Sequence, residues 1–210
     1  MAELTFYTNP MSRGQIARWM LEEVGAEYEQ VILGYADTMK SAEYLAINPM
    51  GKVPAIVHRG QVVTEGAAIC AYLAEAFPDA ALAPRAEERA AYYRWLFFAA
   101  GPVEAAVTNH SIGWNPDDKQ QRMAGYGSYE TVVDTLDGEI AGKQFVCGDR
   151  FTAADVYFGA QIIWGVGFGS LPKRDSFVAY SERLTAREAY RRAKKMDDDL
   201  IAAMQPPAGG

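Results

Sequence analysis

Two short stretches between residues 50 and 66 combine residue types that suit the binding of a small anionic peptide. The first is Met50–Pro54, where an X-Pro bond leads into an apolar strand expected at Ala55–Val57. Proline at a strand start removes a ladder donor, so the backbone of Val53 is left free for another partner. The second is Glu65-Gly66, where an acidic residue opens a helix. A strand edge and a helix N-terminus facing one crevice suit a small peptide that carries a carboxylate.

Alternating short elements position these stretches within the first 80 residues. Apolar and aromatic runs predict strands, and 3.6-residue periodicity predicts helices. In the first helix, Ser12 can act as the N-cap and Gly25 can end the helix. The expected strands are Leu4–Tyr7, Tyr28–Leu33, Ala55–His58 and Gln61–Val63, and the expected helices run from Ser12 to about Val24, Ser41 to Ala46 and about Glu65 to Phe77. This βαβαββα order predicts a mixed sheet with helices on its faces.

Beyond the linker at Asp79–Pro84, only helical periodicity continues. Thr152 and Asp155 have the spacing of a capping box at the start of one of these helices. The expected helices are Ala86 to about His110, Gln121 to about Ile140, Ala153 to about Trp164 and Ala186 to about Met204. The sequence therefore predicts an α/β domain over 1–79, an all-α domain over 85–204 and a disordered Pro/Gly tail over 205–210.

Composition and charge argue against several classes of protein. Half of the 210 residues are hydrophobic and 22% are charged, as in ordinary globular proteins, and the net charge of −7 argues against a nucleic-acid partner. No signal peptide and no membrane-spanning apolar run are apparent, so we expect a cytoplasmic protein without a membrane partner. No metal site is expected, because metal-ligand spacing is lacking for Cys70, Cys147, His58 and His110. Cys70 fits a core position, and both histidines fit surface or satisfied-core positions.

Three motifs together resemble those of cytosolic glutathione transferases, and the resemblance covers nearly the whole chain. They are Asn48-Pro-x-Gly-Lys-Val-Pro54, Thr64-Glu-Gly-x-Ala-Ile69 and the Thr152-x-x-Asp155 box. The Glu65-Gly66 pair, where many classes have Glu-Ser, is most similar to the bacterial beta-class enzymes. The resemblance implies an α/β thioredoxin-like N-terminal domain and an all-α C-terminal helical domain that contributes a pocket for the second substrate.

By this resemblance, glutathione is the co-substrate and is held by the first domain. The Val53 backbone would pair with the cysteinyl unit, beside a cis Pro54, as in strand addition. Glu65 would accept from the γ-glutamyl ammonium, and the backbone N–H of Gly66 would bind the γ-glutamyl carboxylate. Two lysines could reach the glycyl carboxylate or could equally be solvated surface charges; they are Lys40 and Lys52.

The implied chemistry needs the glutathione thiol as a thiolate. A free thiol has a pKa of about 8.5, and lowering it by about 2 units, worth roughly 2.7 kcal/mol, would ionise most of it at pH 7. A hydroxyl donor plus a helix N-terminus can supply that. Ser12, where theta-like classes have serine, is the favoured donor. Tyr7, where alpha, mu and pi classes have tyrosine, is the alternative, and a backbone group or another donor is the third possibility. Arg13 would add positive potential near the sulfur or form a domain-interface salt bridge.

The chain departs from the beta-class pattern in two places. Ser12 stands where beta-class enzymes have a catalytic cysteine, and Phe97–Glu104 lacks the polar residues, including histidine, that they carry there. Mixed-disulfide and redox roles are therefore not expected, and the electrophile pocket should be apolar. Its candidate lining residues are Met11, Phe98, Trp114 and Trp164, followed by Tyr126 and Phe168.

Several functions stay open at this point. The first is transfer of glutathione to an apolar electrophile, in keeping with detoxification. The second is isomerase, dehalogenase or peroxidase chemistry with glutathione on the same fold. The third is a non-catalytic binding module, which the joint presence of Ser12, Val53-Pro54 and Glu65 disfavours. We expect a homodimer, as the family forms, with aromatic residues such as Tyr92 and Tyr93 at its two-fold contact. The sequence does not identify the electrophile.

Overall fold

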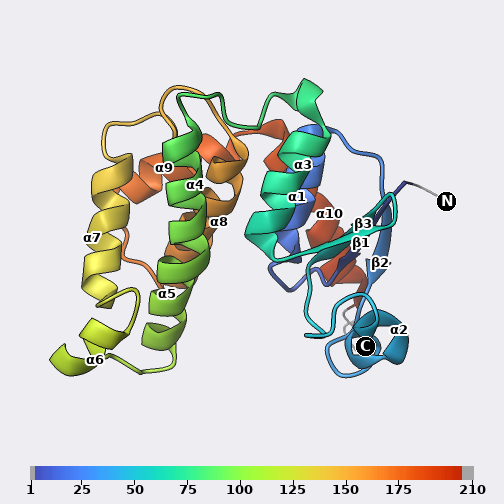
Figure 1. Ribbon diagram of the computed structural model, residues 1–210, viewed down its shortest axis with the longest axis horizontal. Helices are drawn as coiled ribbons and strands as arrows, with labels where there is room; N and C mark the ends of the chain where they lie inside the picture. The colour runs from blue at the N-terminus through green and yellow to red at the C-terminus, as the bar shows by residue number, and fades with distance from the viewer. Residues whose placement is uncertain (1–2, 205–210) are drawn as a thin grey trace, which may run out of the picture. The chain divides into compact units, whose positions relative to one another are not determined.

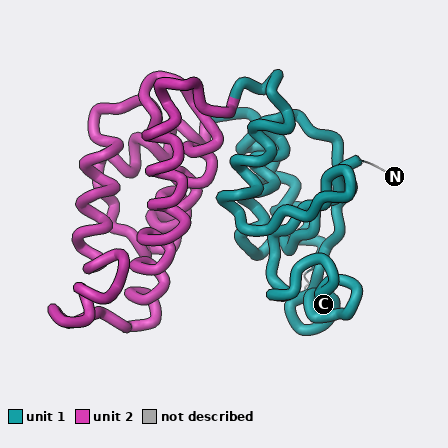
Figure 2. Tube along the Cα trace, viewed as in Figure 1, with its two compact units in different colours: residues 1–81, 187–210 teal, residues 82–186 magenta. Residues whose placement is uncertain are grey.

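The computed structural model describes residues 3–204, which fall into two compact units, coloured separately in Figure 2. Unit 1 comprises residues 1–81 and 187–210, and unit 2 comprises residues 82–186. The disordered tail predicted at 205–210 lies outside the described residues. Among residues 3–204, no helix is both long enough and apolar enough to cross a bilayer.

Unit 1 contains a four-stranded mixed sheet in the order β2-β1-β3-β4. Its strands are β1 (Leu4–Thr8), β2 (Glu29–Ile32), β3 (Ala55–His58) and β4 (Gln61–Thr64). The β1–β2 pair is parallel, whereas β1–β3 and β3–β4 are antiparallel. The predicted βαβαββα order and the thioredoxin-like fold are confirmed.

The strand β1 presents alternate residues to the two faces of the sheet. Tyr7 packs against an apolar cluster that includes Met39 and Tyr44. These two residues lie in the segment that contains the 3₁₀ turn Thr38–Lys40 and α2 (Ala42–Leu45). Phe6, which points to the other face, is completely buried. Each face of this small sheet is therefore covered by its own apolar layer.

In unit 1, α1 (Gly14–Val24) packs against both α3 (Gly66–Ala76) and α10 (Glu188–Met204). As predicted, α1 ends at Gly25, which has a left-handed φ of 65° that glycine adopts without steric cost. The short 3₁₀ turn Pro78–Ala80 follows α3. The helix α10 lies against α1 (Figure 1), and the two are joined by a fully buried ion pair in which Arg18 Nε lies 2.9 Å from Asp197 Oδ1.

The last helix thus belongs to the same compact unit as the sheet, although it follows all of unit 2 in the sequence. From the sequence, residues 85–204 are expected to form one helical domain. That division into domains stays a prediction. The compact units differ from it because the contacts of α10 are made with α1.

Unit 2 is helical and contains α4 (Arg89–Phe98), α5 (Glu104–Ser111), α6 (Asp118–Met123), α7 (Tyr129–Ile140), α8 (Ala153–Phe168) and α9 (Asp175–Thr185). A π-helical turn at Ala99–Val103 connects α4 to α5 and contains Pro102. Proline has no N–H to donate to the preceding turn, which accounts for the local widening of a stretch expected to be one regular helix.

The single helix predicted from Gln121 to Ile140 is wrong, because the chain forms α6 and α7 instead. Gly125 and Gly127 fall in the break, and Gly127 has a φ of 71°. Ser128 then caps α7, its hydroxyl accepting from the Thr131 N–H at 3.1 Å. The helix α9 was not predicted at all.

The capping box at the start of α8 is confirmed. Asp155 is fully buried and accepts four hydrogen bonds, from the Val146 N–H, the Tyr180 hydroxyl, and the N–H and hydroxyl of Thr152. Burial raises the pKa of the Asp155 carboxyl, and these donors oppose that rise. The box therefore ties the 146–152 loop and α9 to the first turn of α8.

The sequence predicts both Tyr92 and Tyr93 at a dimer contact. The prediction is wrong for Tyr92. This residue is 1% exposed and lies inside unit 2, whereas Tyr93 is 42% exposed. Helix periodicity brings consecutive residues to different faces, so the two neighbours were never equivalent.

Candidate functional site

Three loops meet at one end of the sheet of unit 1. Tyr7 near the end of β1 pairs with Ala55 at the start of β3, and Ala55 pairs with Thr64 at the end of β4. The same end of the sheet therefore carries the β1–α1 loop, the segment before β3 and the start of α3. These are the segments from which the sequence predicts catalytic and glutathione-binding residues.

Asn9 shapes the β1–α1 loop, and sequence reasoning gave it no role. It is buried, its Nδ2 donates to the Leu33 carbonyl at 2.7 Å, and its Oδ1 accepts from the Met11 N–H at 2.9 Å. Asparagine commonly bonds backbone groups two residues ahead in turns, so the Asn9-Pro10 pair was the available signal. The Tyr35 hydroxyl also donates to the Met11 carbonyl, at 3.1 Å.

Ser12 is half-buried in this loop and uses its hydroxyl locally. Its Oγ donates to the Asn9 carbonyl at 2.6 Å and accepts from the Gly14 N–H at 2.9 Å. The residue at the N-cap position of α1 is Arg13, which is exposed and makes no side-chain cap bond. The N-cap position predicted for Ser12 is therefore wrong, and Ser12 satisfies one amide of the first turn from one residue further out. Its proton can reach another acceptor only by leaving Asn9.

The alternative hydroxyl, that of Tyr7, belongs to a ring within the apolar cluster. The Tyr7 and Tyr44 ring centroids are 5.5 Å apart, and Tyr7 is half-buried. This placement matches the interpretation of Tyr7 as a core aromatic residue. The choice between the Ser12 and Tyr7 hydroxyls stays a prediction.

Side chains of unit 1 hold the segment before β3 in place. The Val53–Pro54 bond is cis. The Lys52 carbonyl accepts from the Tyr44 hydroxyl at 2.5 Å and from Asn48 Nδ2 at 2.8 Å. Burial raises the pKa of Tyr44 to about 12. Within residues 3–204, neither the N–H nor the C=O of Val53 has a hydrogen-bond partner.

The two candidate lysines differ in their surroundings. The Lys40 ammonium donates to the carbonyls of Gly51 at 2.8 Å and Met50 at 3.3 Å. A Cβ at Gly51, whose φ is 56°, would lie 2.7 Å from Lys40 Nζ. Lys40 therefore braces the turn that precedes Val53. Lys52 is exposed in the same turn.

Glu65 has an unusual backbone at the start of α3. Its φ is 65°, a region that costs a non-glycine residue of order 1–3 kcal/mol, so the surrounding structure must enforce it. The side chain is exposed, caps no backbone group of α3, and has no ionic or hydrogen-bond partner among the described residues. Gly66 follows as the first residue of the helix, where backbone N–H groups lack intrahelical acceptors. A carboxylate and free amides therefore stand side by side.

The residues predicted to line an electrophile pocket come from both units. Met11 is 59% exposed in unit 1. In unit 2, Trp114 is 41% exposed after α5, Phe98 packs on Trp95, and Trp164 packs on Phe168. The Tyr126 hydroxyl accepts from Asn109 Nδ2 at 3.0 Å. The pocket they would form together stays a prediction.

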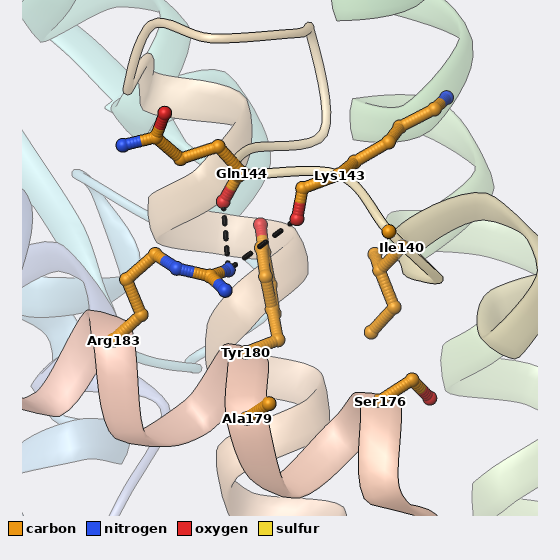
Figure 3. Close-up of a pocket in the computed structure, with 8 residues that line it drawn as sticks. Ile140, Lys143, Gln144, Ser176, Ala179, Tyr180 and Arg183 are labelled. Atoms are coloured by element: carbon orange, nitrogen blue, oxygen red, sulfur yellow. Dashed lines mark hydrogen bonds between the residues drawn. The ribbon is translucent and has the colours of Figure 1, made fainter.

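A hollow of about 540 Å³ lies within unit 2, between the end of α7 and α9 (Figure 3). None of the predicted site residues lines it. Its polar groups serve the fold: Arg183 donates to the Gln144 carbonyl at 2.9 Å, and the Tyr180 hydroxyl donates to Asp155 at 2.7 Å. We assign this hollow no role in the chemistry.

The core position expected for Cys70 is confirmed, and of the surface and core positions left open for the histidines His58 takes the core one. His58 is 4% exposed, shares a hydrogen bond of 2.9 Å with the Tyr72 hydroxyl and stacks on Phe77. Cys70 is buried in α3, and burial raises the pKa of its thiol. His110, on the surface, stacks on Tyr129 with 3.9 Å between ring centroids.

The architecture, a thioredoxin-like sheet unit with a helical unit, is that of the cytosolic glutathione transferases, and comparison with known proteins agrees. The family model described as "Glutathione S-transferase, N-terminal domain" matches residues 2–75. The chain is 30% identical over 181 residues to glutathione S-transferase GST-4.5 of Xanthomonas campestris pv. campestris, with 81% of this chain and 82% of that protein covered. It is 27% identical over 176 residues to glutathione S-transferase GstA of Escherichia coli O157:H7, covering 80% and 85%.

A solved glutathione S-transferase structure is also similar to this chain. A sphingomonad glutathione S-transferase complexed with glutathione has a TM-score of 0.75 and 26% identity, covering 92% of this chain and 98% of that one. The chain belongs to the glutathione S-transferase family. The closer similarity to beta-class enzymes expected from the sequence stays a prediction.

Proposed function

We propose that this protein is a glutathione transferase that binds glutathione at the end of the unit 1 sheet and presents it as a thiolate to an apolar electrophile. One observation carries the proposal. Strand register places at that sheet end the segments that carry Val53, Glu65 and Ser12, and among residues 3–204 the Val53 backbone and the Glu65 carboxylate have no hydrogen-bond partner.

Each group matches a different part of glutathione. The Val53 N–H and C=O pair with the cysteinyl unit as an added strand, which fixes the register of the peptide without using charge. Glu65 accepts from the γ-glutamyl ammonium, and the first N–H groups of α3, starting at Gly66, bind the γ-glutamyl carboxylate. Lys52 is the better placed lysine for the glycyl carboxylate, because Lys40 is engaged with the carbonyls of Met50 and Gly51.

Ser12 donates to the glutathione sulfur in this proposal. The pKa of the glutathione thiol must fall by about 2 units, worth roughly 2.7 kcal/mol, for the thiol to be mostly ionised at pH 7. A hydroxyl donor together with the positive end of the α1 dipole is of that order. Arg13, exposed at the N-cap of α1, adds positive potential on the same side. Tyr7 is the alternative donor.

The identity of the electrophile decides between conjugation and the other glutathione chemistries. Isomerase, dehalogenase and peroxidase activities share the thiolate and differ only in what it attacks. The test is turnover by the purified protein, with glutathione, of a panel containing an activated aryl halide, an epoxide and an organic hydroperoxide. Glutathione binding measured by calorimetry without turnover of any member would instead favour a non-catalytic binding module.

Replacing Glu65 by glutamine is expected to weaken glutathione binding by about 10- to 100-fold, because a charge-assisted contact to an ammonium is worth about 1.5–3 kcal/mol. Isothermal calorimetry checks this. Glu75→Gln, which changes another exposed glutamate on the same helix, is the matched control and should leave the affinity unchanged. Equal affinities for wild type and Glu65→Gln would remove Glu65 from the site.

We also propose a cytoplasmic homodimer. The two free cysteines, Cys70 and Cys147, suit a reducing compartment. On α4, Phe97 is 67% exposed and stacks with the exposed Tyr93, an apolar pair suited to a two-fold contact. Sedimentation equilibrium at micromolar protein should give twice the 23.1 kDa chain mass. A Phe97→Asp variant should shift that mass toward the monomer, and a monomeric wild type would contradict the proposal.

A further inference from the structure

The hydroxyl of Thr8 is buried at the end of β1 and has no hydrogen-bond partner among residues 3–204. Thr8 is 0% exposed, and its Oγ1 bonds to no described group. A buried hydroxyl without a partner destabilises the folded state, and valine has the same shape without that cost. A threonine at this position is therefore explained if its hydroxyl gains a hydrogen-bond partner in another state of the site.

The hydroxyl oxygens of Thr8 and Ser12 both lie beside Gly14, on the side where a Cβ would stand. A Cβ built on Gly14 would lie 2.0 Å from Thr8 Oγ1 and 3.0 Å from Ser12 Oγ. Gly14 is buried, and its N–H donates to Ser12 Oγ at 2.9 Å. Only glycine leaves room for two hydroxyls to converge on the first turn of α1.

Counting donors and acceptors shows how the two hydroxyls can connect. A serine hydroxyl has one proton and two acceptor positions. The Ser12 proton is given to the Asn9 carbonyl, and one acceptor position is filled by the Gly14 N–H. The second acceptor position is open, and the Thr8 O–H is the nearby donor that lacks an acceptor.

We propose that Thr8 is a positioning residue for thiol activation, whose hydroxyl donates to Ser12 Oγ when Ser12 leaves the Asn9 carbonyl and donates to the sulfur of glutathione. The inference rests on the role of Ser12 proposed above. With two donors on its oxygen, Ser12 is held toward the sulfur, and its own O–H becomes more polarised. The bond also satisfies the orphaned Thr8 hydroxyl, which offsets the loss of the Asn9 bond.

The test compares Thr8→Val with Thr8→Ser. Thr8→Val keeps the shape and removes the hydroxyl, so the pKa of bound glutathione should rise by about 0.5–1 unit, as expected for one neutral hydrogen bond. The value of kcat/KM at pH 7 should fall by about 3- to 10-fold and recover at high pH. Thr8→Ser should retain the wild-type pH profile. The readouts are the ultraviolet absorbance of bound thiolate against pH and turnover of an activated aryl chloride.

Stability separates this role from a purely structural one. Because the Thr8 hydroxyl has no partner in the described part of the chain, Thr8→Val should keep or raise Tm while thiol activation is weakened. A lower Tm with an activity loss that is equal at every pH would overturn the proposal. So would a Thr8→Val profile identical to wild type.

The Ser12→Ala background separates this inference from the proposed function. There, adding Thr8→Val should change neither the thiol pKa nor kcat/KM. If Ser12→Ala raises the thiol pKa and Thr8→Val alone does not, the Thr8 role is wrong and the Ser12 role stands. If Ser12→Ala itself leaves the pKa unchanged, the Ser12 role fails and the Thr8 role fails with it.

Discussion

Replacing Ser12 by alanine should lower kcat by about 10- to 1,000-fold at pH 7 while glutathione affinity changes only a few-fold. The loss of rate is the range expected on removing one preorganised donor from a developing charge. Affinity should persist because the peptide is held by the Val53 backbone, Glu65 and the first amides of α3. The pKa of bound glutathione should rise, and part of the lost rate should return at high pH, where solvent alone ionises the thiol.

Tyr7→Phe is the matched comparison for Ser12→Ala, because it removes the only other hydroxyl that the sequence offers as donor. Its ring packs in the cluster with Tyr44, so the variant should fold and should keep the wild-type thiol pKa. Titration of the bound thiolate by ultraviolet absorbance in both variants gives the answer. A raised pKa in Tyr7→Phe with an unchanged one in Ser12→Ala would transfer the catalytic role to Tyr7.

Replacing Arg18 by methionine should reduce the free energy of unfolding at pH 7.5 by about 3–5 kcal/mol, the usual cost of leaving one member of a buried ion pair alone. Both side chains of the Arg18–Asp197 pair are 0% exposed. Burial raises the pKa of Asp197 to about 6, with the guanidinium of Arg18 opposing the rise. Without Arg18, the folded-state pKa must climb further, and the folded protein must hold a proton that the unfolded chain releases.

The pH dependence of this loss has a definite sign. A carboxyl whose folded pKa lies above its unfolded value makes the fold less stable as pH rises through the folded pKa. The gap between wild type and Arg18→Met should therefore be smallest at pH 5 and widen above about pH 6. Urea titrations at both pH values check this. The control is Lys195→Met, which breaks an exposed pair with Asp199 on the same helix and should cost less than about 1 kcal/mol. A gap that is constant with pH would show that Arg18 acts through packing alone.

Much of unit 1 could be predicted from the sequence because its elements are short and end at strong local signals. Gly25 and the pair Pro78-Asp79 mark helix ends, and Asn48–Gly51 marks the turn before β3. The register that brings the three loops together follows from the strand order. The candidate glutathione-binding segments were therefore predictable as a set.

Other features depend on contacts that local patterns do not contain. The break between α6 and α7 is an exception, because Gly125 and Gly127 mark it in the sequence. The bond from Ser12 to the Asn9 carbonyl, the brace from Lys40 to Gly51 and the left-handed backbone of Glu65 are set by how the loops close. The partner of Arg18 is 179 residues away in the sequence, which no local reading can reach.

That separation has a consequence for how the protein is made. A ribosome adds about 5–20 residues per second, so the sheet segments of unit 1 emerge long before α10. Until residues 187–204 leave the ribosome, Arg18 cannot form its ion pair with Asp197. The face of α1 that packs against α10 also stays exposed until then. Unit 2 is continuous and can fold first, although it is synthesised second. A nascent chain stalled before α10, or a fragment ending near residue 81, should accordingly be degraded or retained by chaperones, whereas the released full chain should not.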